Sequence, residues 1–122
     1  MKPNKMKAKI QAGETAFGVS IMIPSVQIVE MVGLLGFDWI LIDCEHGNIT
    51  LEAAEALTLA AEAVGLTPIA RPRKNAPEEI LQLMDRGAMG VQVPHVKTAQ
   101  DAQNAVNAVK YYPQGTRGLG GG

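Results

Sequence analysis

The hydrophobic and polar positions of the chain follow one pattern that repeats four times. Short, nearly continuous apolar runs lie at residues 17–23, 37–43, 67–71 and 89–96. After each run, apolar residues recur three or four positions apart, as they do on one face of a helix. Continuous apolar runs are typical of strands that are covered on both faces in a parallel sheet. The pattern therefore predicts four βα units, preceded by a short helix over residues 5–12.

Residues that favour helix ends mark the boundaries of these units. Glycines stand where three of the helices should end, at Gly36, Gly65 and Gly87, and glycine readily adopts the left-handed conformation that terminates a helix. Side chains that can cap a helix N-terminus precede all four helical patterns: Ser25, Asn48 with Thr50, Asn75, and Thr98. Thr98 and Asp101 have the spacing of a capping box. Each helix is thus predicted with a start signal of its own.

Alternating strands and helices with short links predict an α/β fold with a parallel sheet. A doubly wound open sheet and a barrel both fit this order. The glycine-rich turn of a dinucleotide-binding open sheet is missing, because residues 21–25 read IMIPS after the first strand. A (β/α)8 barrel needs about 250 residues and eight units. We therefore expect residues 1–122 to form the first half, (β/α)4, of a TIM barrel domain whose remaining strands lie outside this chain.

A half barrel by itself is physically unfavourable. The edges of its first and fourth strands would be unpaired, and the side chains of its lumen would meet water. Exposed apolar edges of this kind promote dimerisation or aggregation. We therefore expect either a longer protein or a half barrel that pairs with another half.

Composition narrows the classes of partner. The 122 residues are 47% hydrophobic and 4% aromatic, with a formal net charge of −1. Nucleic acids and anionic membranes select basic surfaces, so neither is an expected partner. No apolar run approaches the ~20 residues of a membrane span, and none follows the basic N-terminus as in a secretory signal. With a single cysteine in addition, the composition predicts a cytoplasmic protein.

Polar side chains gather where the predicted strands end. The tetrapeptide DCEH at residues 43–46 follows the second strand, Arg71 ends the third, and His95 lies in the fourth. In parallel α/β barrels the reactive residues lie at the carboxyl ends of the strands. A metal site built from Asp43, Glu45, His46 and His95 is disfavoured, because adjacent strand residues point to opposite faces. His95 is expected to line the mouth without direct chemistry, and Cys44 to fill space.

Five segments carry a resemblance to a known family. They read GFDWILIDCEH at 36–46, IARP at 69–72, LMDRGA at 83–88, VPHV at 93–96 and YPQGTRG at 112–118. In this order they resemble the HpcH/HpaI aldolase family, which includes 4-hydroxy-2-oxoheptanedioate aldolase and 2-keto-3-deoxy-sugar-acid aldolases. The resemblance covers nearly the whole chain. It implies a metal-dependent aldolase that cleaves 4-hydroxy-2-oxo acids to pyruvate and an aldehyde through an enolate.

The resemblance also implies roles for particular residues. His46 matches the family's catalytic base, and an imidazole titrates near neutral pH. Arg71 matches the residue that stabilises charge on the carbonyl oxygen, a role that suits a permanently charged guanidinium. Asp43 and Glu45 would lie close to the expected metal and could orient waters or hold His46. Asp85 matches a residue that raises the basicity of the histidine.

The resemblance has consequences for assembly and cofactor. Asp85 falls at the end of a helix, on the face of the barrel opposite His46, so we expect a homo-oligomer with sites built at subunit interfaces. The implied cofactor is a divalent metal, Mg, Mn or Co. Its ligands, a glutamate and an aspartate, are expected on later strands, with none in this chain. The chain alone is therefore expected to be inactive.

Alternatives remain open at this point. Each site residue has a structural interpretation: Asp43 as a cap of the next loop, Glu45 as a partner of Arg71 or Arg73, and His46 as a polar loop residue. The chain could also be a non-catalytic half-barrel assembly module. A third possibility is a related lyase, of the oxaloacetate decarboxylase or citryl-thioester lyase type, because the same residues serve any enolate intermediate.

Overall fold

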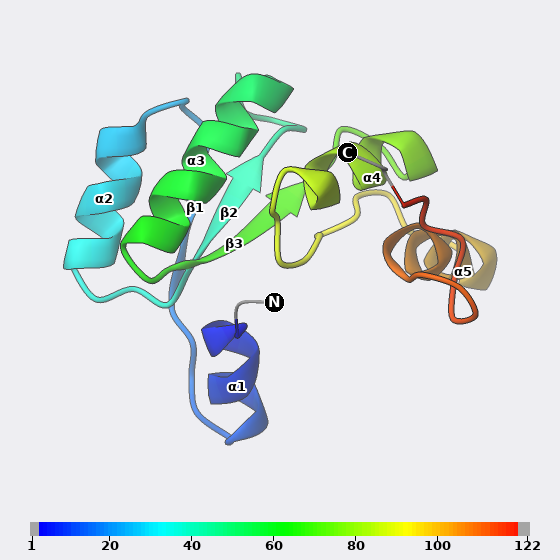
Figure 1. The fold of residues 1–122 in the computed structure, drawn as a ribbon, viewed down its shortest axis with the longest axis horizontal. Coiled ribbons are helices and arrows are strands. Elements are labelled where there is room, and N and C mark those ends of the chain that lie inside the picture. Colours follow the sequence, from blue (N-terminus) through cyan, green and yellow to red (C-terminus); the bar gives the residue numbers. More distant parts are fainter. Residues whose placement is uncertain (1–2, 120–122) are drawn as a thin grey trace.

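The computed structural model describes residues 3–119, and within them the predicted alternation of strands and helices is present (Figure 1). The residues described form three strands, which make one parallel sheet, and five helices. The strands are β1 (Gly18–Ile21), β2 (Trp39–Asp43) and β3 (Thr67–Arg71). The helices are α1 (Lys5–Gln11), α2 (Val26–Leu34), α3 (Leu51–Ala63), α4 (Pro77–Asp85) and α5 (Ala99–Val109).

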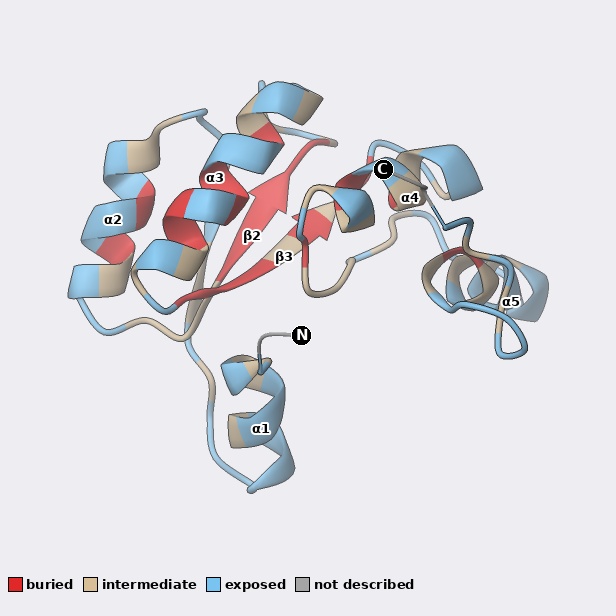
Figure 2. Ribbon diagram, viewed as in Figure 1, coloured by how far each residue is buried: buried red, intermediate tan, exposed pale blue. Residues whose placement is uncertain are grey.

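The sheet has the order β1-β2-β3, and its parallel pairing puts all three carboxyl ends at one edge. Helices α2 and α3 cover one face of it (Figure 1). Ile40 and Ile42 of β2 point into this layer and are fully buried with Val29 of α2 and Leu57 of α3. Figure 2 shows the burial concentrated on β2 and on the sides of α2 and α3 that face the sheet. The core therefore fixes β2 as the centre of the sheet.

The other face of the sheet carries the side chains that matter for chemistry. Side chains alternate along a strand, so Leu41 and Asp43 point away from the helix layer that receives Ile40 and Ile42. Asp43 is nevertheless fully buried. Its partner in the register of β3 is Arg71, the last residue of that strand. The fold thus places the Asp43 carboxylate and the Arg71 guanidinium at the same level of the sheet and on the same face.

The predicted helix ends are largely confirmed. Ser25, Thr50 and Thr98 accept hydrogen bonds as N-caps, the last within a complete capping box. The three glycines after helices all have positive φ: Gly36 at 84°, Gly65 at 81° and Gly87 at 95°. The prediction for Asn75 is wrong. The N-cap of α4 is Ala76, whose methyl group cannot accept a hydrogen bond. The Asn75 amide instead donates to the Asp101 carbonyl, 3.0 Å away, at the start of α5.

The fourth strand, predicted over residues 89–96, is not formed. An isolated parallel bridge joins Val91 to Ala70 of β3, and the backbone hydrogen bonds to β3 extend only from Met89 to Gln92. Pro94 has no N–H to donate, and His95 adopts a left-handed backbone with φ of 57°, which turns the chain out of the extended conformation. The α/β class and the parallel sheet are therefore confirmed, whereas the fourth unit has its helix, α5, without a strand.

Helix α1 packs at the amino ends of the strands, away from the polar edge (Figure 1). The backbone N–H of Met6 donates to the Thr67 hydroxyl at 3.2 Å, where β3 begins. The Lys9 ammonium lies 2.8 Å from the carboxylate of Asp38, which directly precedes β2. Both contacts tie α1 to the end of the sheet opposite Asp43 and Arg71. Within residues 3–119 no helix has the length and apolar character needed to cross a membrane.

The capping box of α5 should contribute measurably to stability. Thr98 Oγ1 accepts from the Asp101 N–H at 3.1 Å, and the Asp101 carboxylate accepts from the Thr98 N–H at 2.9 Å. We expect Thr98→Ala to lower the free energy of unfolding by about 1 kcal/mol in denaturant titrations. Thr116→Ala, at an exposed threonine outside the helices, is the matched control. Equal stability of the two variants would contradict a role for the cap.

Candidate active site

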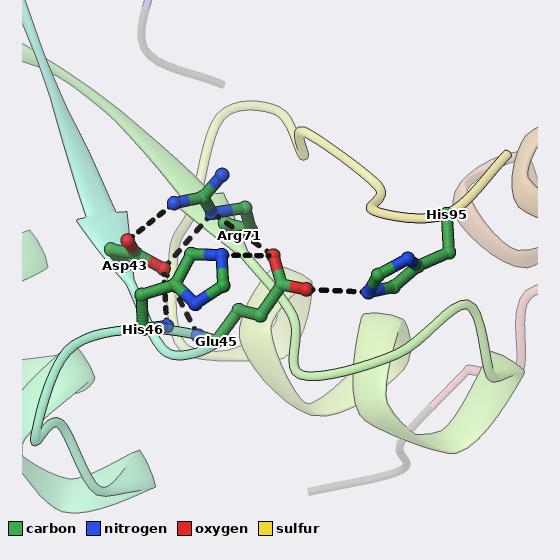
Figure 3. A network of polar contacts seen from close by, with 5 residues as sticks. All are labelled: Asp43, Glu45, His46, Arg71 and His95. Carbon is green, nitrogen blue, oxygen red and sulfur yellow. Dashed lines mark hydrogen bonds and ion pairs between the residues drawn. The ribbon is translucent and has the colours of Figure 1, made fainter.

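The carboxylate of Asp43 organises the turn that follows β2. Its Oδ1 accepts hydrogen bonds from the backbone N–H groups of Glu45, at 3.0 Å, and His46, at 3.1 Å (Figure 3). The strand ends at Asp43, so Glu45 and His46 are free of the alternation that would send neighbouring side chains to opposite faces. Asp43 therefore caps the loop, as its structural interpretation predicts, and sets the backbone from which Glu45 and His46 project.

The same carboxylate forms a two-point ion pair with Arg71. The Arg71 Nε donates to Oδ1 at 2.9 Å and Nη2 donates to Oδ2 at 2.5 Å. The guanidinium lowers the pKa of Asp43 to about 2; burial acts in the opposite direction, and the two backbone N–H groups help to lower it. The bond to Asp43 raises the pKa of Arg71. Both groups are therefore charged at neutral pH.

Glu45 is the residue that connects the others. Its side chain is only 11% exposed, and its Oε2 lies 3.5 Å from both the Arg71 Nε and the His46 Nε2. Its other oxygen, Oε1, lies 2.7 Å from the Nε2 of His95 (Figure 3). One carboxylate thus faces a guanidinium and two imidazoles. The pairing of Glu45 with Arg71 agrees with its structural interpretation, and His95 is brought into the cluster although it lies fifty residues later in the chain.

The cluster combines accessible and buried groups in a way that suits acid–base chemistry. The imidazole of His46 is 61% exposed, whereas the side chain of Arg71 is 21% exposed. Within the described residues, the hydrogen bonds of Arg71 use Nε and Nη2 and leave the donors of Nη1 unused. An accessible imidazole beside a fixed cation can take a proton from a substrate while the cation stabilises an oxyanion.

The residues of the cluster do not fit a metal ion. Among residues 3–119, no group of three or more His, Cys, Asp or Glu side chains is arranged to hold one. The Asp43 carboxylate already accepts from two backbone N–H groups and from Arg71. The candidate residues therefore form a network of hydrogen bonds and ion pairs.

Cys44 lies on the other side of the strand end and belongs to the hydrophobic core. Burial raises the pKa of its thiol. Because the thiolate is the reactive form of cysteine, this environment suits a residue that fills space.

Within one chain, the structure does not bring Asp85 into contact with the other candidate site residues. It is the last residue of α4, and its Oδ1 accepts from the Nη2 of Arg117 at 2.8 Å. The Arg117 guanidinium also lies over the Tyr111 ring, 4.7 Å from its centroid. Among the described residues, no hydrogen bond or ion pair joins Asp85 to His46. Sequence reasoning did not find Arg117 as the partner of Asp85, because thirty-two positions separate them.

Comparison with known proteins identifies the family of the chain. Residues 20–121 match the family model described as HpcH/HpaI aldolase/citrate lyase. The chain belongs to this family. It is 36% identical over 118 residues to the hydroxypyruvate/pyruvate aldolase of Sagittula stellata, covering 97% of this chain and 47% of that protein. It is also 36% identical over 117 residues to the 4-hydroxy-2-oxo-heptane-1,7-dioate aldolase of Escherichia coli, covering 96% and 45%.

Solved structures contain the same fold over about half of their length. The citrate synthase SbnG superposes with a TM-score of 0.91 at 34% identity, covering 96% of this chain and 48% of that one. An HpcH/HpaI aldolase from Desulfitobacterium hafniense gives 0.90 at 29% identity, covering 98% and 46%. The chain therefore spans slightly less than half the length of these relatives and solved structures.

The Asp43–Arg71 pair should make stability depend on acid pH. Because the folded pKa of Asp43 is lowered from 3.8 to about 2, its contribution is complete above the unfolded value and is lost as pH falls through the folded one. The shift corresponds to about 2 kcal/mol. We expect Asp43→Asn to be less stable than wild type at pH 7, and the difference to shrink by roughly this amount near pH 2 in denaturant titrations. An equal difference at both pH values would contradict the assignment.

Proposed function

We propose that the complete protein carrying this chain is an aldolase that cleaves 4-hydroxy-2-oxo acids to pyruvate and an aldehyde. The observation that carries the proposal is the convergence of an accessible imidazole, His46, and a fixed guanidinium, Arg71, on the carboxylate of Glu45. Membership of the family and relatives named as aldolases support the same reaction class.

The proposed reaction uses each group for one task. His46 takes the proton of the C4 hydroxyl, the C3–C4 bond breaks, and C4 leaves as the aldehyde carbonyl. The electron pair of that bond forms the enolate of pyruvate, whose oxygen Arg71 stabilises. Return of the proton to C3 gives pyruvate. The Glu45 carboxylate lies 3.5 Å from the His46 Nε2 and faces the ring that carries the proton in between. Asp43 holds the guanidinium and the turn in place.

The cofactor belongs to the proposal through the family resemblance. A divalent metal ion (Mg, Mn or Co) would, when bound, neutralise charge on the 2-oxo acid. As the family resemblance implies, we propose that its ligands, a glutamate and an aspartate, lie on strands outside this chain. The roles of His46 and Arg71 given above depend on no metal-bound group.

We also propose that residues 1–122 are the N-terminal half of one barrel domain. The chain covers 47% of one aldolase relative and 48% of one solved structure. The outer edge of β1 has no strand partner within residues 3–119, and Phe17 beside it is 63% exposed. The rest of a barrel would cover both. Asp85 would then act on the His46 of a neighbouring subunit in a homo-oligomer, since the two do not meet in one chain.

A second candidate function rests on the structural similarity to a citrate synthase, at a TM-score of 0.91. It favours a related reaction on the same scaffold, such as oxaloacetate decarboxylation or cleavage of a citryl thioester. Profiling of these substrates beside 4-hydroxy-2-oxo acids separates the candidates. A tight dimer without any of these activities would instead support a non-catalytic assembly module.

Removal of the His46 imidazole should abolish most turnover without loss of stability. In the full-length protein with Mg, Mn or Co, we expect His46→Gln to lower kcat for pyruvate release by about 10²- to 10⁴-fold. The melting temperature should stay close to wild type, because the side chain is 61% exposed. Glu14→Gln, at an exposed site outside the cluster, is the control. Wild-type turnover of His46→Gln would refute the proposed mechanism.

Replacement of Arg71 should lower stability as well as turnover, unlike replacement of His46. Arg71→Ala leaves the carboxylate of Asp43 buried without its cation, and breaking such a pair typically costs about 3–5 kcal/mol. We therefore expect this variant to lose both turnover and stability, measured by the same assay and by thermal unfolding. A stable but inactive Arg71→Ala would show that Asp43 finds another partner and that Arg71 serves catalysis alone.

The half-barrel proposal predicts a difference between the chain and the full-length protein. We expect residues 1–122 alone to self-associate, because the β1 edge and Phe17 are uncovered, and to release no pyruvate. Light scattering after size-exclusion chromatography and the aldolase assay measure the two properties. An intact mass near twice 13.0 kDa for the protein from its source would agree with a complete barrel. A monomeric, active 122-residue chain would overturn the proposal.

A further inference from the structure

His95 has an unusual backbone for its position. Its φ is 57°, and it is the one non-glycine residue within the described part of the chain with a positive φ. Side chains other than glycine adopt this conformation rarely, and such backbone outliers are common at functional sites. Here the left-handed residue follows Pro94, three positions after the last backbone hydrogen bond of this segment to β3, from the Gln92 N–H to the Ala70 carbonyl. Figure 3 shows the imidazole directed from this turn toward Glu45.

The contact that results is the shortest one made by Glu45. The Nε2 of His95 lies 2.7 Å from Oε1, whereas Oε2 lies 3.5 Å from the nearest nitrogens of His46 and Arg71. The two oxygens belong to one planar carboxylate, so a bond that fixes Oε1 also fixes the direction of Oε2. Within the described residues no hydrogen bond or ion pair joins His95 to His46 or Arg71.

We propose that His95 is a positioning residue, which holds Oε1 of Glu45 and thereby aims Oε2 at His46 and Arg71. A glutamate side chain has three rotatable bonds, and in a loop it loses conformational freedom only through such contacts. Glu45 is 11% exposed and its backbone is fixed by Asp43, so the bond from His95 completes its placement. The catalytic consequence rests on the proposed function, because it requires His46 and Arg71 to act on the substrate.

Three variants of the full-length protein separate the contact from the backbone. His95→Leu removes the hydrogen bond, His95→Gln keeps a donor of similar reach, and His95→Gly removes the ring while it relieves the left-handed backbone. We expect kcat of His95→Leu and His95→Gly to fall by roughly 10- to 100-fold with KM nearly unchanged, since small misplacements of reacting groups have effects of this size. His95→Gln should recover most of the loss. A His95→Gly variant as active as wild type would overturn the proposal.

A double-mutant cycle tests whether His95 acts through Glu45. If it does, the double variant Glu45→Gln/His95→Leu loses no more turnover than Glu45→Gln alone. Losses that multiply would show that His95 acts independently, and the proposal would be wrong.

A spectroscopic readout keeps the inference testable without turnover. In full-length protein with ¹⁵N-labelled histidine, the ring signals of His46 should shift in His95→Leu and return toward wild type in His95→Gln, at unchanged melting temperature. If wild type shows no aldolase activity, the proposed function fails, while a shift of the His46 signals still supports the positioning role. Unchanged His46 signals in His95→Leu would overturn that role, whatever the activity.

Discussion

The buried ion pair between Asp43 and Arg71 is the interaction on which the site depends. The parallel register pairs these two residues as the last positions of β2 and β3, on the same face of the sheet. A fully buried carboxylate is tolerated only when charged partners and hydrogen bonds compensate its lost hydration. The guanidinium and two backbone N–H groups supply them. The hydrogen bonds that satisfy the buried Asp43 carboxylate therefore also fix the loop that carries Glu45 and His46. The electrostatics of the strand ends thus determine the geometry of the site.

The division of the sheet into two faces explains how a small core supports this arrangement. Ile40 and Ile42 pack against α2 and α3 and hold β2 rigidly, while the intervening and following positions point to the polar face. The backbone that the core orders then determines where the charged groups at the polar edge lie. Helix α1 is attached at the opposite end through Asp38 and Thr67 and does not compete for that edge.

The sequence predicted what depends on local pattern. Apolar runs located the strands, and glycines with positive φ ended the helices as expected. The gathering of Asp43, Glu45, His46 and Arg71 also followed from strand ends meeting at one edge. Contacts set by one unusual torsion or by competition between partners could not be predicted. His95 contacts Glu45 from a left-handed backbone, and the Asn75 amide bonds to a carbonyl of α5 instead of capping α4. The strand that periodicity predicts over residues 89–96 is reduced to one bridge, because β3, its partner, ends at Arg71 and is followed by Pro72.

The placement of Asp85 shows how one residue can serve both the single chain and a proposed interface. Its partner Arg117 is 11% exposed and stacks on Tyr111, so the guanidinium is held firmly beside α4. Asp85 itself is 41% exposed. A carboxylate accepts about four hydrogen bonds, and the contact with Arg117 occupies one oxygen of Asp85. Its second oxygen can therefore accept from a group on another subunit without breaking the pair. The ion pair would then orient Asp85 toward a neighbouring His46, in the same way that Arg71 orients Asp43 within the chain.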